Sequence, residues 1–140
     1  MQKLVFVVDD LDTNLTQAET ALEEHYTVLT MSSAEKMFKL LGKMTPQLIL
    51  LDIEMPGLNG FDAMDRLQAD SKFATIPVIF VTAKRDTEIE ERCYDMGAAD
   101  FVPKPFADVG LLNRVRTHIN LRALLKDCPE YGKTIGAKAM

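Results

Sequence analysis

The stretch QLILLDIEMPGLNG, residues Gln47–Gly60, decides the fold of this chain. Leu48–Leu51 is a continuous apolar run, and it is short enough to be a strand that is buried on both faces of a sheet. The run ends at Asp52, and the proline and glycines that follow indicate a turn. Open α/β sheets bind their ligands at the carboxyl ends of parallel strands. The sequence therefore makes Asp52 a candidate nucleophile.

Length and composition indicate one globular domain. The chain has 140 residues, of which 47% are hydrophobic and 26% charged, so it can form a core without disulfides or structural metal. Its net charge of −5 disfavours a surface for nucleic acid or for anionic membranes. No apolar run approaches the roughly 18–20 residues that span a bilayer. We expect a chain that contacts neither nucleic acid nor membrane directly.

Two further features predict a cytoplasmic location. Asp9 and Asp10 interrupt the first apolar run almost at once, which does not fit a secretory signal peptide. Cys93 and Cys128 lie far apart and form no C-x-x-C pair, so both are expected to be reduced thiols. Helical spacing with Ile89 makes Cys93 a core residue rather than a reactive thiol.

Five short apolar runs alternate with five segments that carry apolar residues at helical spacing. The expected strands are Lys3–Val8, Tyr26–Met31, Gln47–Leu51, Val78–Val81 and Asp100–Val102. Asp12 or Thr13 is expected to cap the first helix, and the third helix is expected to begin near Leu58. The alternation predicts an α/β fold, a doubly wound (βα)5 unit with a five-stranded parallel sheet. The order 2-1-3-4-5 of flavodoxin-like proteins suits five strands, and it would bring Asp9, Asp10 and Asp52 to one crevice.

The last helix sets the expected domain boundary. The core should be complete near Ile119, but three leucines within residues 121–125 continue the helical spacing. These leucines either finish the packing of this domain or begin a helix that contacts a partner, and we favour the second interpretation. Beyond them, prolines and glycines break any periodicity. We assign residues 1–125 to one domain and residues 126–140 to a tail or linker.

Three carboxylates at one crevice require a counter-charge, because their mutual repulsion raises their pKa values. A divalent cation would supply it, and a ligand set made only of oxygens favours Mg²⁺ or Mn²⁺. With such a cation present, Asp52 could attack a phosphoryl group and hold it as an aspartyl phosphate. Thr82 ends the fourth strand and Lys104 follows the fifth, so both would face the same crevice and contact phosphoryl oxygens.

These residues stand in an order that carries a family resemblance. The motif residues are Asp9-Asp10, Asp52 with Met55-Pro56-Gly57 and Gly60, Thr82-Ala83, and Lys104-Pro105. The set resembles the receiver domain of two-component response regulators, over about residues 1–125. The resemblance implies that Asp52 is the phosphoacceptor. Its phosphoryl group would come from the phosphohistidine of a sensor histidine kinase or of a histidine phosphotransfer protein.

The resemblance also implies roles for the neighbouring residues. Asp10 would bind Mg²⁺ directly, Asp9 would hold it through water, and Glu54 would offer its backbone carbonyl. Thr82 and Lys104 would contact the phosphoryl group. The protein would then be a switch that catalyses its own phosphorylation and dephosphorylation rather than a turnover enzyme.

The switch itself is expected on one face of the domain. Phe101 is the implied switch residue, although many members have tyrosine there and Phe101 could equally be a core residue. The Lys104–Pro105 peptide bond is expected to be cis. Phosphorylation would change the face formed by the fourth helix, the fifth strand and the fifth helix. A second copy of the chain or a C-terminal output domain would dock on that face.

Two other functions share parts of this pattern. A flavodoxin-like electron carrier has the same strand order, but it needs a neutral phosphate loop after the first strand, where this chain has Asp9 and Asp10. A Mg²⁺-dependent phosphohydrolase that forms an aspartyl phosphate usually has a second acid two residues after its nucleophile, and Glu54 occupies that position. The chain shows no insertion for a substrate-enclosing cap, which favours the receiver.

Overall fold

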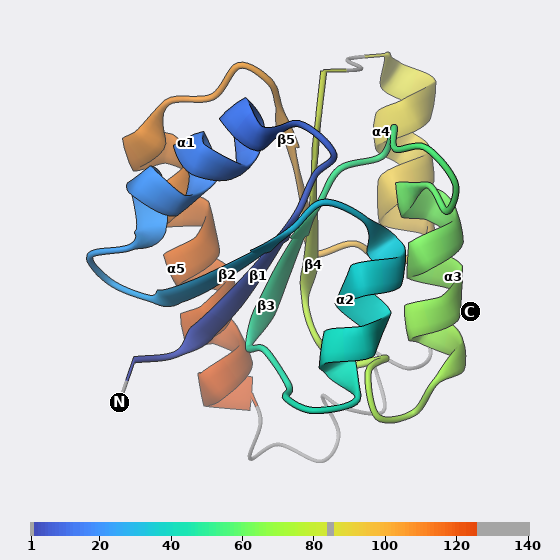
Figure 1. Cartoon of the computed structure of the whole chain (residues 1–140), viewed down its shortest axis with the longest axis horizontal. Helices are drawn as coiled ribbons and strands as arrows, with labels where there is room; N and C mark the ends of the chain where they lie inside the picture. The colour runs from blue at the N-terminus through green and yellow to red at the C-terminus, as the bar shows by residue number, and fades with distance from the viewer. Residues whose placement is uncertain (1, 84–85, 126–140) are drawn as a thin grey trace.

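Strands and helices alternate along the part of the chain that the structure describes, residues 2–83 and 86–125 of a computed structural model (Figure 1). The strands are β1 (Leu4–Val8), β2 (Thr27–Met31), β3 (Leu48–Leu51), β4 (Val78–Thr82) and β5 (Asp100–Pro103). The helices are α1 (Asp12–Leu22), α2 (Ala34–Leu41), α3 (Gly60–Ala69), α4 (Thr87–Asp95) and α5 (Asp108–Leu125). The strands form one parallel sheet in the order β2-β1-β3-β4-β5. The fold class and strand order predicted from the sequence are confirmed.

Helices cover both faces of the sheet, with α2, α3 and α4 on one face and α1 and α5 on the other (Figure 1). Successive side chains of a strand point to opposite faces, so each face has its own core. Phe6 and Phe80 lie in the core under α2, α3 and α4, while Val7 and Ile79 lie in the core under α1 and α5. All four residues of β3 are buried, as expected for a central strand of a doubly covered sheet.

The strand register places the carboxyl ends of β1, β3, β4 and β5 at one edge of the sheet. Val8 of β1 pairs with Leu51 of β3, so the acids that follow these two residues are neighbours. The N–H of Asp52 donates to the carbonyl of Val8 at 3.0 Å. On the other side of β4, Thr82 pairs with Pro103, which places Lys104 directly after the paired region.

Gly60 allows α3 to begin against the end of β3. A Cβ atom at Gly60 would overlap the carbonyl oxygen of Asp52 and would lie 2.8 Å from the Cα of Ile53. Gly57, in the turn between these elements, has a φ of +75°, which favours glycine. The two glycines therefore let the chain return closely over the residue that follows β3.

The third helix begins later than predicted, after Asn59 rather than near Leu58. The Asn59 side-chain oxygen accepts the N–H of Asp62 at 2.9 Å, which caps the helix and fixes its start at Gly60. An asparagine side chain that follows a proline-containing turn was the signal for this boundary.

The predicted cap of α1 was wrong. The helix begins at Asp12, Leu11 occupies the N-cap position, and no side chain caps the helix there. The reason lies upstream, because Oδ1 of Asp9 accepts the N–H of Leu11 at 3.0 Å and turns the chain into the helix before Thr13. A carboxylate of the candidate site thus also shapes the loop after β1.

Helix α5 continues past the core that it covers. Leu111, Val115 and Ile119 are buried, whereas Leu121 is 41% and Leu124 is 77% exposed. Leu121 and Leu124 therefore add little to the core of the domain, and contact of this segment with a partner stays a prediction. Residues 126–140, predicted to be a tail or linker, lie outside the described residues. In residues 2–83 and 86–125, no helix combines the length and the apolar character that crossing a membrane requires.

Candidate functional site

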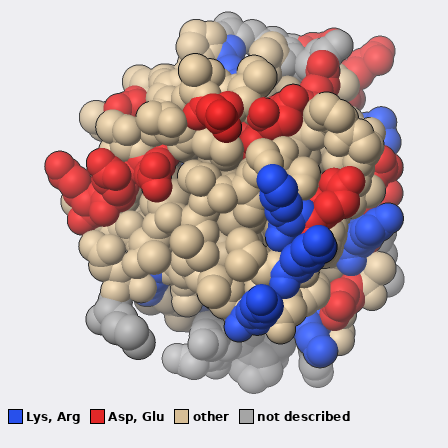
Figure 2. Space-filling model, in the orientation of Figure 1, with Lys and Arg blue, Asp and Glu red and all other residues tan. Residues whose placement is uncertain are grey.

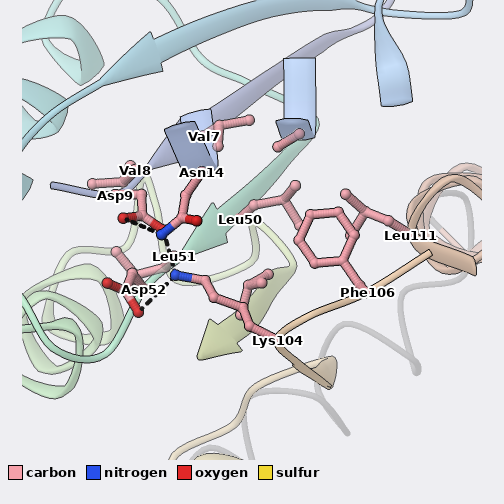
Figure 3. A pocket seen from close by; sticks show the side chains of 12 residues that line it. Val7, Val8, Asp9, Asn14, Leu50, Leu51, Asp52, Lys104, Phe106 and Leu111 are labelled. Carbon is pink, nitrogen blue, oxygen red and sulfur yellow. Dashed lines mark hydrogen bonds and ion pairs between the residues drawn. The ribbon is translucent and has the colours of Figure 1, made fainter. Parts of the chain in front are cut away.

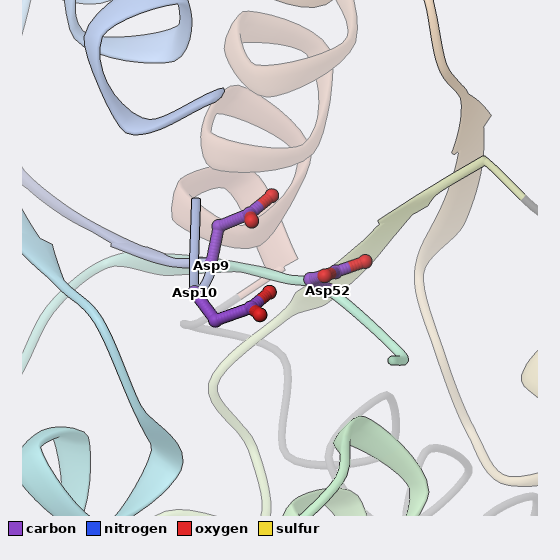
Figure 4. A group of neighbouring side chains, drawn as sticks. All are labelled: Asp9, Asp10 and Asp52. Carbon is purple, nitrogen blue, oxygen red and sulfur yellow. The ribbon is translucent and has the colours of Figure 1, made fainter. Parts of the chain in front are cut away.

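Three carboxylates meet where β1 and β3 end (Figure 4). Asp9 and Asp10 follow β1, and Asp52 follows β3. One oxygen atom from each side chain lies within 4.8 Å of the others. Asp9 is 4% and Asp52 is 6% exposed, so both carboxylates are largely removed from water. The structure brings together the three acids that the predicted strand order places at one crevice.

Lys104 supplies positive charge to this cluster from the loop after β5. Its Nζ atom lies 2.5 Å from Oδ2 of Asp9 and 3.5 Å from Oδ1 of Asp52. The Lys104 N–H donates to the carbonyl of Thr82 at 2.8 Å, which ties the loop to the end of β4. The Lys104–Pro105 peptide bond is cis, the geometry that the family resemblance implies.

Asn14 completes the environment of Asp9 (Figure 3). Its Nδ2 atom donates to Oδ1 of Asp9 at 3.3 Å, and the N–H of Leu11 donates to the same oxygen. The other oxygen, Oδ2, faces Lys104. Each oxygen of this buried carboxylate therefore has a donor, as buried charged groups require.

The negative charge on Asp52 is less well stabilised than the negative charge on Asp9. Burial and the nearby charge of Asp9 raise the pKa of Asp52 from 3.8 to about 6, although the ammonium group of Lys104 opposes the shift. Part of the Asp52 population is therefore protonated in mildly acidic solution. A further cation at this crevice would favour the charged form, which is the nucleophilic one.

Six of the eight predicted site residues line one cleft of about 490 Å³ at the edge of the sheet. The residues that line it are Asp10, Leu11, Asn14, Gln17, Asp52, Glu54, Thr82, Ala83, Lys104 and Pro105. Thr82 lies at the end of β4, where it lines the cleft although it is only 1% exposed. Asp9 and Phe101 are not among these residues. Phe101 is 6% exposed and belongs to the core under α2, α3 and α4.

The donor set of the cleft fits a hard divalent cation. Carboxylate oxygens are the ligands that Mg²⁺ and Mn²⁺ prefer, and neither histidine nor cysteine belongs to the cluster. Three acids with one lysine leave an excess of negative charge, which a dication would balance. An open cleft beside the acids leaves room for water or a phosphoryl oxygen in the rest of a metal's coordination shell.

Residues 5–116 match the family described as "Response regulator receiver domain". The chain belongs to this family. The match supports the receiver interpretation, and it supports neither the phosphohydrolase nor the flavodoxin-like alternative.

Relatives and solved structures agree with this receiver assignment. The chain is 32% identical over 128 residues to "Response regulator PleD" of Caulobacter vibrioides, which covers 91% of this chain and 28% of the relative. It is 31% identical over 118 residues to a "Probable cyclic di-GMP phosphodiesterase" of Vibrio cholerae, covering 84% of this chain and 27% of the relative. The receiver domain thus spans about a quarter of the length of these curated relatives.

One solved structure shows the same agreement in three dimensions. The signal receiver domain of a putative LuxO repressor protein from Vibrio parahaemolyticus superimposes with a TM-score of 0.82 at 25% identity. The superposition covers 91% of this chain and 96% of that one. The two chains therefore share the receiver fold along nearly their whole length.

Sequence reasoning missed one cluster of charged residues, on the face formed by α4, β5 and α5. Oδ1 of Asp100 accepts from Nη1 of Arg114 at 2.8 Å, and Oδ2 lies 3.0 Å from Nε2 of His118. Burial would raise the pKa of Asp100, but bonds from His118, from the Phe101 N–H and from Arg114 outweigh it and lower the pKa to about 2. The four-residue spacing of Arg114 and His118 on one helix face was the signal that could have found it.

Proposed function

We propose that this receiver domain accepts a phosphoryl group on Asp52. One observation carries the proposal. A buried carboxylate at the end of a central strand borders an open cleft, with two more acids within 4.8 Å and an ammonium group at 3.5 Å. Such a carboxylate can act as a nucleophile toward a phosphoryl group that binds in the cleft together with a cation.

The proposed cation is Mg²⁺ or Mn²⁺. The residues that would hold it are Asp10 and Asp52 through their carboxylates, Glu54 through its backbone carbonyl, and Asp9 through water. When bound, the cation neutralises the acids and the phosphoryl oxygens that approach them. Acids alone would repel a phosphoryl group, so phosphorylation should depend on the divalent cation.

The proposed reaction transfers a phosphoryl group from a histidine nitrogen to a carboxylate oxygen of Asp52. An oxygen of Asp52 attacks the phosphorus of a phosphohistidine, a P–O bond forms, and the P–N bond breaks with its electron pair staying on the imidazole. Lys104 and Thr82, which border the same cleft, would bind the equatorial oxygens of the phosphoryl group. Later attack of water on the phosphorus would return Asp52 to its carboxylate and release phosphate.

The proposed output is a change in the α4–β5–α5 face. Phosphorylation adds roughly −1.5 to −2 charges, by analogy with other phosphorylated side chains. Bonds from Thr82 and Lys104 to the new group would shift the ends of β4 and β5, and Phe101 would read this shift through packing. A full inversion of such an equilibrium needs about 5.5 kcal/mol of differential stabilisation. A second copy of the chain or an output domain would dock on this face.

The direct test is phosphorylation by acetyl phosphate in the presence of Mg²⁺, followed by intact mass spectrometry. Wild-type protein should gain one phosphoryl group, and EDTA should prevent the gain. Asp52→Asn should not be labelled. The matched control is Asp65→Asn, at an exposed acid of α3, which should be labelled like wild type. Equal labelling of Asp52→Asn and wild type would overturn the proposed phosphoacceptor.

The proposed docking of a second copy has its own measurement. Sedimentation velocity of phosphorylated and unphosphorylated protein should show dimers only after phosphorylation. Because the α4–β5–α5 face is proposed to form the contact, Arg114→Glu should weaken the dimer while leaving labelling of Asp52 intact. A dimer that survives Arg114→Glu would move the contact to another face.

A further inference from the structure

A stripe of basic side chains runs along α2, on the side that faces solvent. Lys36, Lys39 and Lys43 are exposed, and their spacing of three and four residues puts them on one face of the helix and of the turn that follows it. Figure 2 shows several Lys and Arg side chains gathered over α2 and α3, with some Asp and Glu side chains among them, whereas the upper and left parts of that view carry mainly Asp and Glu. In a chain with a net charge of −5, this concentration of positive charge is unusual.

Arg66 of α3 extends the stripe. Its guanidinium group lies over the ring of Phe38, at 6.0 Å from the ring centroid. This cation–π contact holds the exposed Arg66 toward α2. We call Lys36, Lys39, Lys43 and Arg66 the α2 basic stripe.

Within residues 2–83 and 86–125, no residue of the α2 basic stripe forms an ion pair, although exposed Glu35 and Asp62 lie on the same two helices. The ion pairs found there belong to Lys104, Arg114 and His118, and Lys36 instead donates to the hydroxyl of Ser32 at 2.8 Å. Charged groups of like sign that stand together raise the electrostatic energy of the folded chain. An acidic ligand would remove this repulsion.

The α2 basic stripe also lies beside apolar surface. Met44 is 38% exposed at the end of the stripe, and Phe38 and Leu40 are only partly buried. These residues would let a partner bury apolar side chains next to its ion pairs. A surface with both properties suits an amphipathic segment of protein.

We propose that the α2 basic stripe binds an acidic, amphipathic helix of a partner protein. Lys36 and Lys39 are three residues apart on α2, which is about 4.5 Å along a helix axis, and Lys43 follows in the turn after the helix. A helix with glutamates at positions i, i+3 or i+4, and i+7 presents carboxylates at the same spacing. The stripe is on α2 and α3, which cover the opposite face of the sheet from α5.

Two other occupants fit the surface less well. A nucleic acid carries evenly spaced phosphates, and exposed Glu35 and Asp62 on the same two helices would repel some of them. A second copy of the chain would have to place a different, acidic surface on α2. Such a heterologous contact produces rings or open chains of molecules rather than a symmetric dimer. An acidic helix of a partner, in contrast, can carry carboxylates only at the positions that face the α2 basic stripe.

The test measures fluorescence anisotropy of a labelled 15-residue peptide with glutamates at i, i+3 and i+7 and leucines on the adjacent face. The full chain should bind it, with an affinity that falls as salt rises. Lys39→Glu combined with Lys43→Glu should weaken binding at least tenfold. The matched control, Lys3→Glu combined with Arg116→Glu, makes the same charge change at exposed residues elsewhere and should bind like wild type.

Three outcomes would overturn the proposal. These are no binding of the peptide by wild type, equal loss of binding in the control, or equally tight binding of a scrambled peptide or a single-stranded oligonucleotide. Concentration-dependent association of the chain that Lys39→Glu abolishes would instead assign the stripe to a second copy. Circular dichroism and labelling by acetyl phosphate, both unchanged, would show that the variants are folded.

Discussion

The ammonium nitrogen of Lys104 lies 2.5 Å from Oδ2 of Asp9, although 95 residues separate them in the sequence. The contact joins the loop after β5 to the end of β1, across the strand ends of β3 and β4. Both side chains are largely buried, so each offsets the charge of the other where little water reaches them. The contact therefore joins two elements at the acidic crevice and supplies positive charge to the candidate site.

Replacement of Lys104 by glutamine should destabilise the protein. The change leaves Asp9 and Asp52 buried together without a cation, and we expect a loss of about 1–3 kcal/mol in the free energy of unfolding. Urea denaturation at pH 7.5 measures it. Saturating Mg²⁺ should restore part of the loss, because it replaces the missing charge. Lys39→Gln at an exposed position should change stability by less than about 0.5 kcal/mol, and an equal effect of the two changes would contradict this role of Lys104.

Replacement of Asp52 by asparagine should have the opposite effect on stability. The pKa of Asp52 is raised to about 6 from an ordinary value of 3.8, so between these values the folded state binds a proton that the unfolded state does not. Stability therefore rises as pH falls from 6 toward 3.8, and above 6 the full penalty of the buried charge is present. In EDTA at pH 7.5, Asp52→Asn should be more stable by up to about 3 kcal/mol.

The pH dependence of the stability of Asp52→Asn tests whether the buried charge is the cause of the gain. The gain of Asp52→Asn should shrink as the pH is lowered and should be small near pH 4, where folded wild-type Asp52 is protonated and the unfolded state is about half protonated. Urea midpoints of the two proteins between pH 4 and 8 give the comparison. A gain that is the same at every pH would mean that packing, rather than charge, is responsible.

Asp100 should show the reverse dependence on pH. Its pKa is lowered to about 2 from 3.8, so its bonds contribute stability above 3.8 that is lost as pH falls toward 2. Asp100→Asn should reduce the free energy of unfolding by about 2 kcal/mol at pH 7. Thermal unfolding at pH 7 and pH 2.5 measures the difference, which should be smaller at the lower pH. Asp95→Asn, at an exposed residue of α4, is the control and should have little effect at either pH.

Gly60 and Gly110 should respond differently to a methyl group. At Gly60 a Cβ atom would overlap the backbone at Asp52, so Gly60→Ala should displace the start of α3 and cost about 2 kcal/mol or more. At Gly110, within α5, a Cβ atom meets nothing within 4 Å, so Gly110→Ala should stabilise the protein by about 0.5–1 kcal/mol. Chemical denaturation of both variants measures the two changes in the free energy of unfolding. If Gly60→Ala left this free energy unchanged, the close approach of Gly60 to the backbone at Asp52 would be contradicted.

Local sequence determined the elements and the direction of the sheet. The run of four apolar residues in β3 is long enough for a strand and too short for a helix. Because such runs alternate with amphipathic segments, few topologies other than a parallel sheet remain. Residues at strand ends, such as Asp52 and Thr82, could be assigned to one edge because parallel strands all end on the same side. The start of α1 could not be read locally, because Asp9 controls it from outside the helix.

By itself, then, the sequence determined the fold class and which residues stand at strand ends, because periodicity and strand ends are local properties of the chain. The strand order was predicted from the number of strands and the common order that suits it. The tertiary structure alone decided how Lys104 divides its charge between Asp9 and Asp52, and that Asp100 binds Arg114 and His118. It also decided that Arg66 joins the α2 basic stripe over Phe38. The physical reason is that such contacts depend on distances between elements, which follow from packing and not from spacing along the chain.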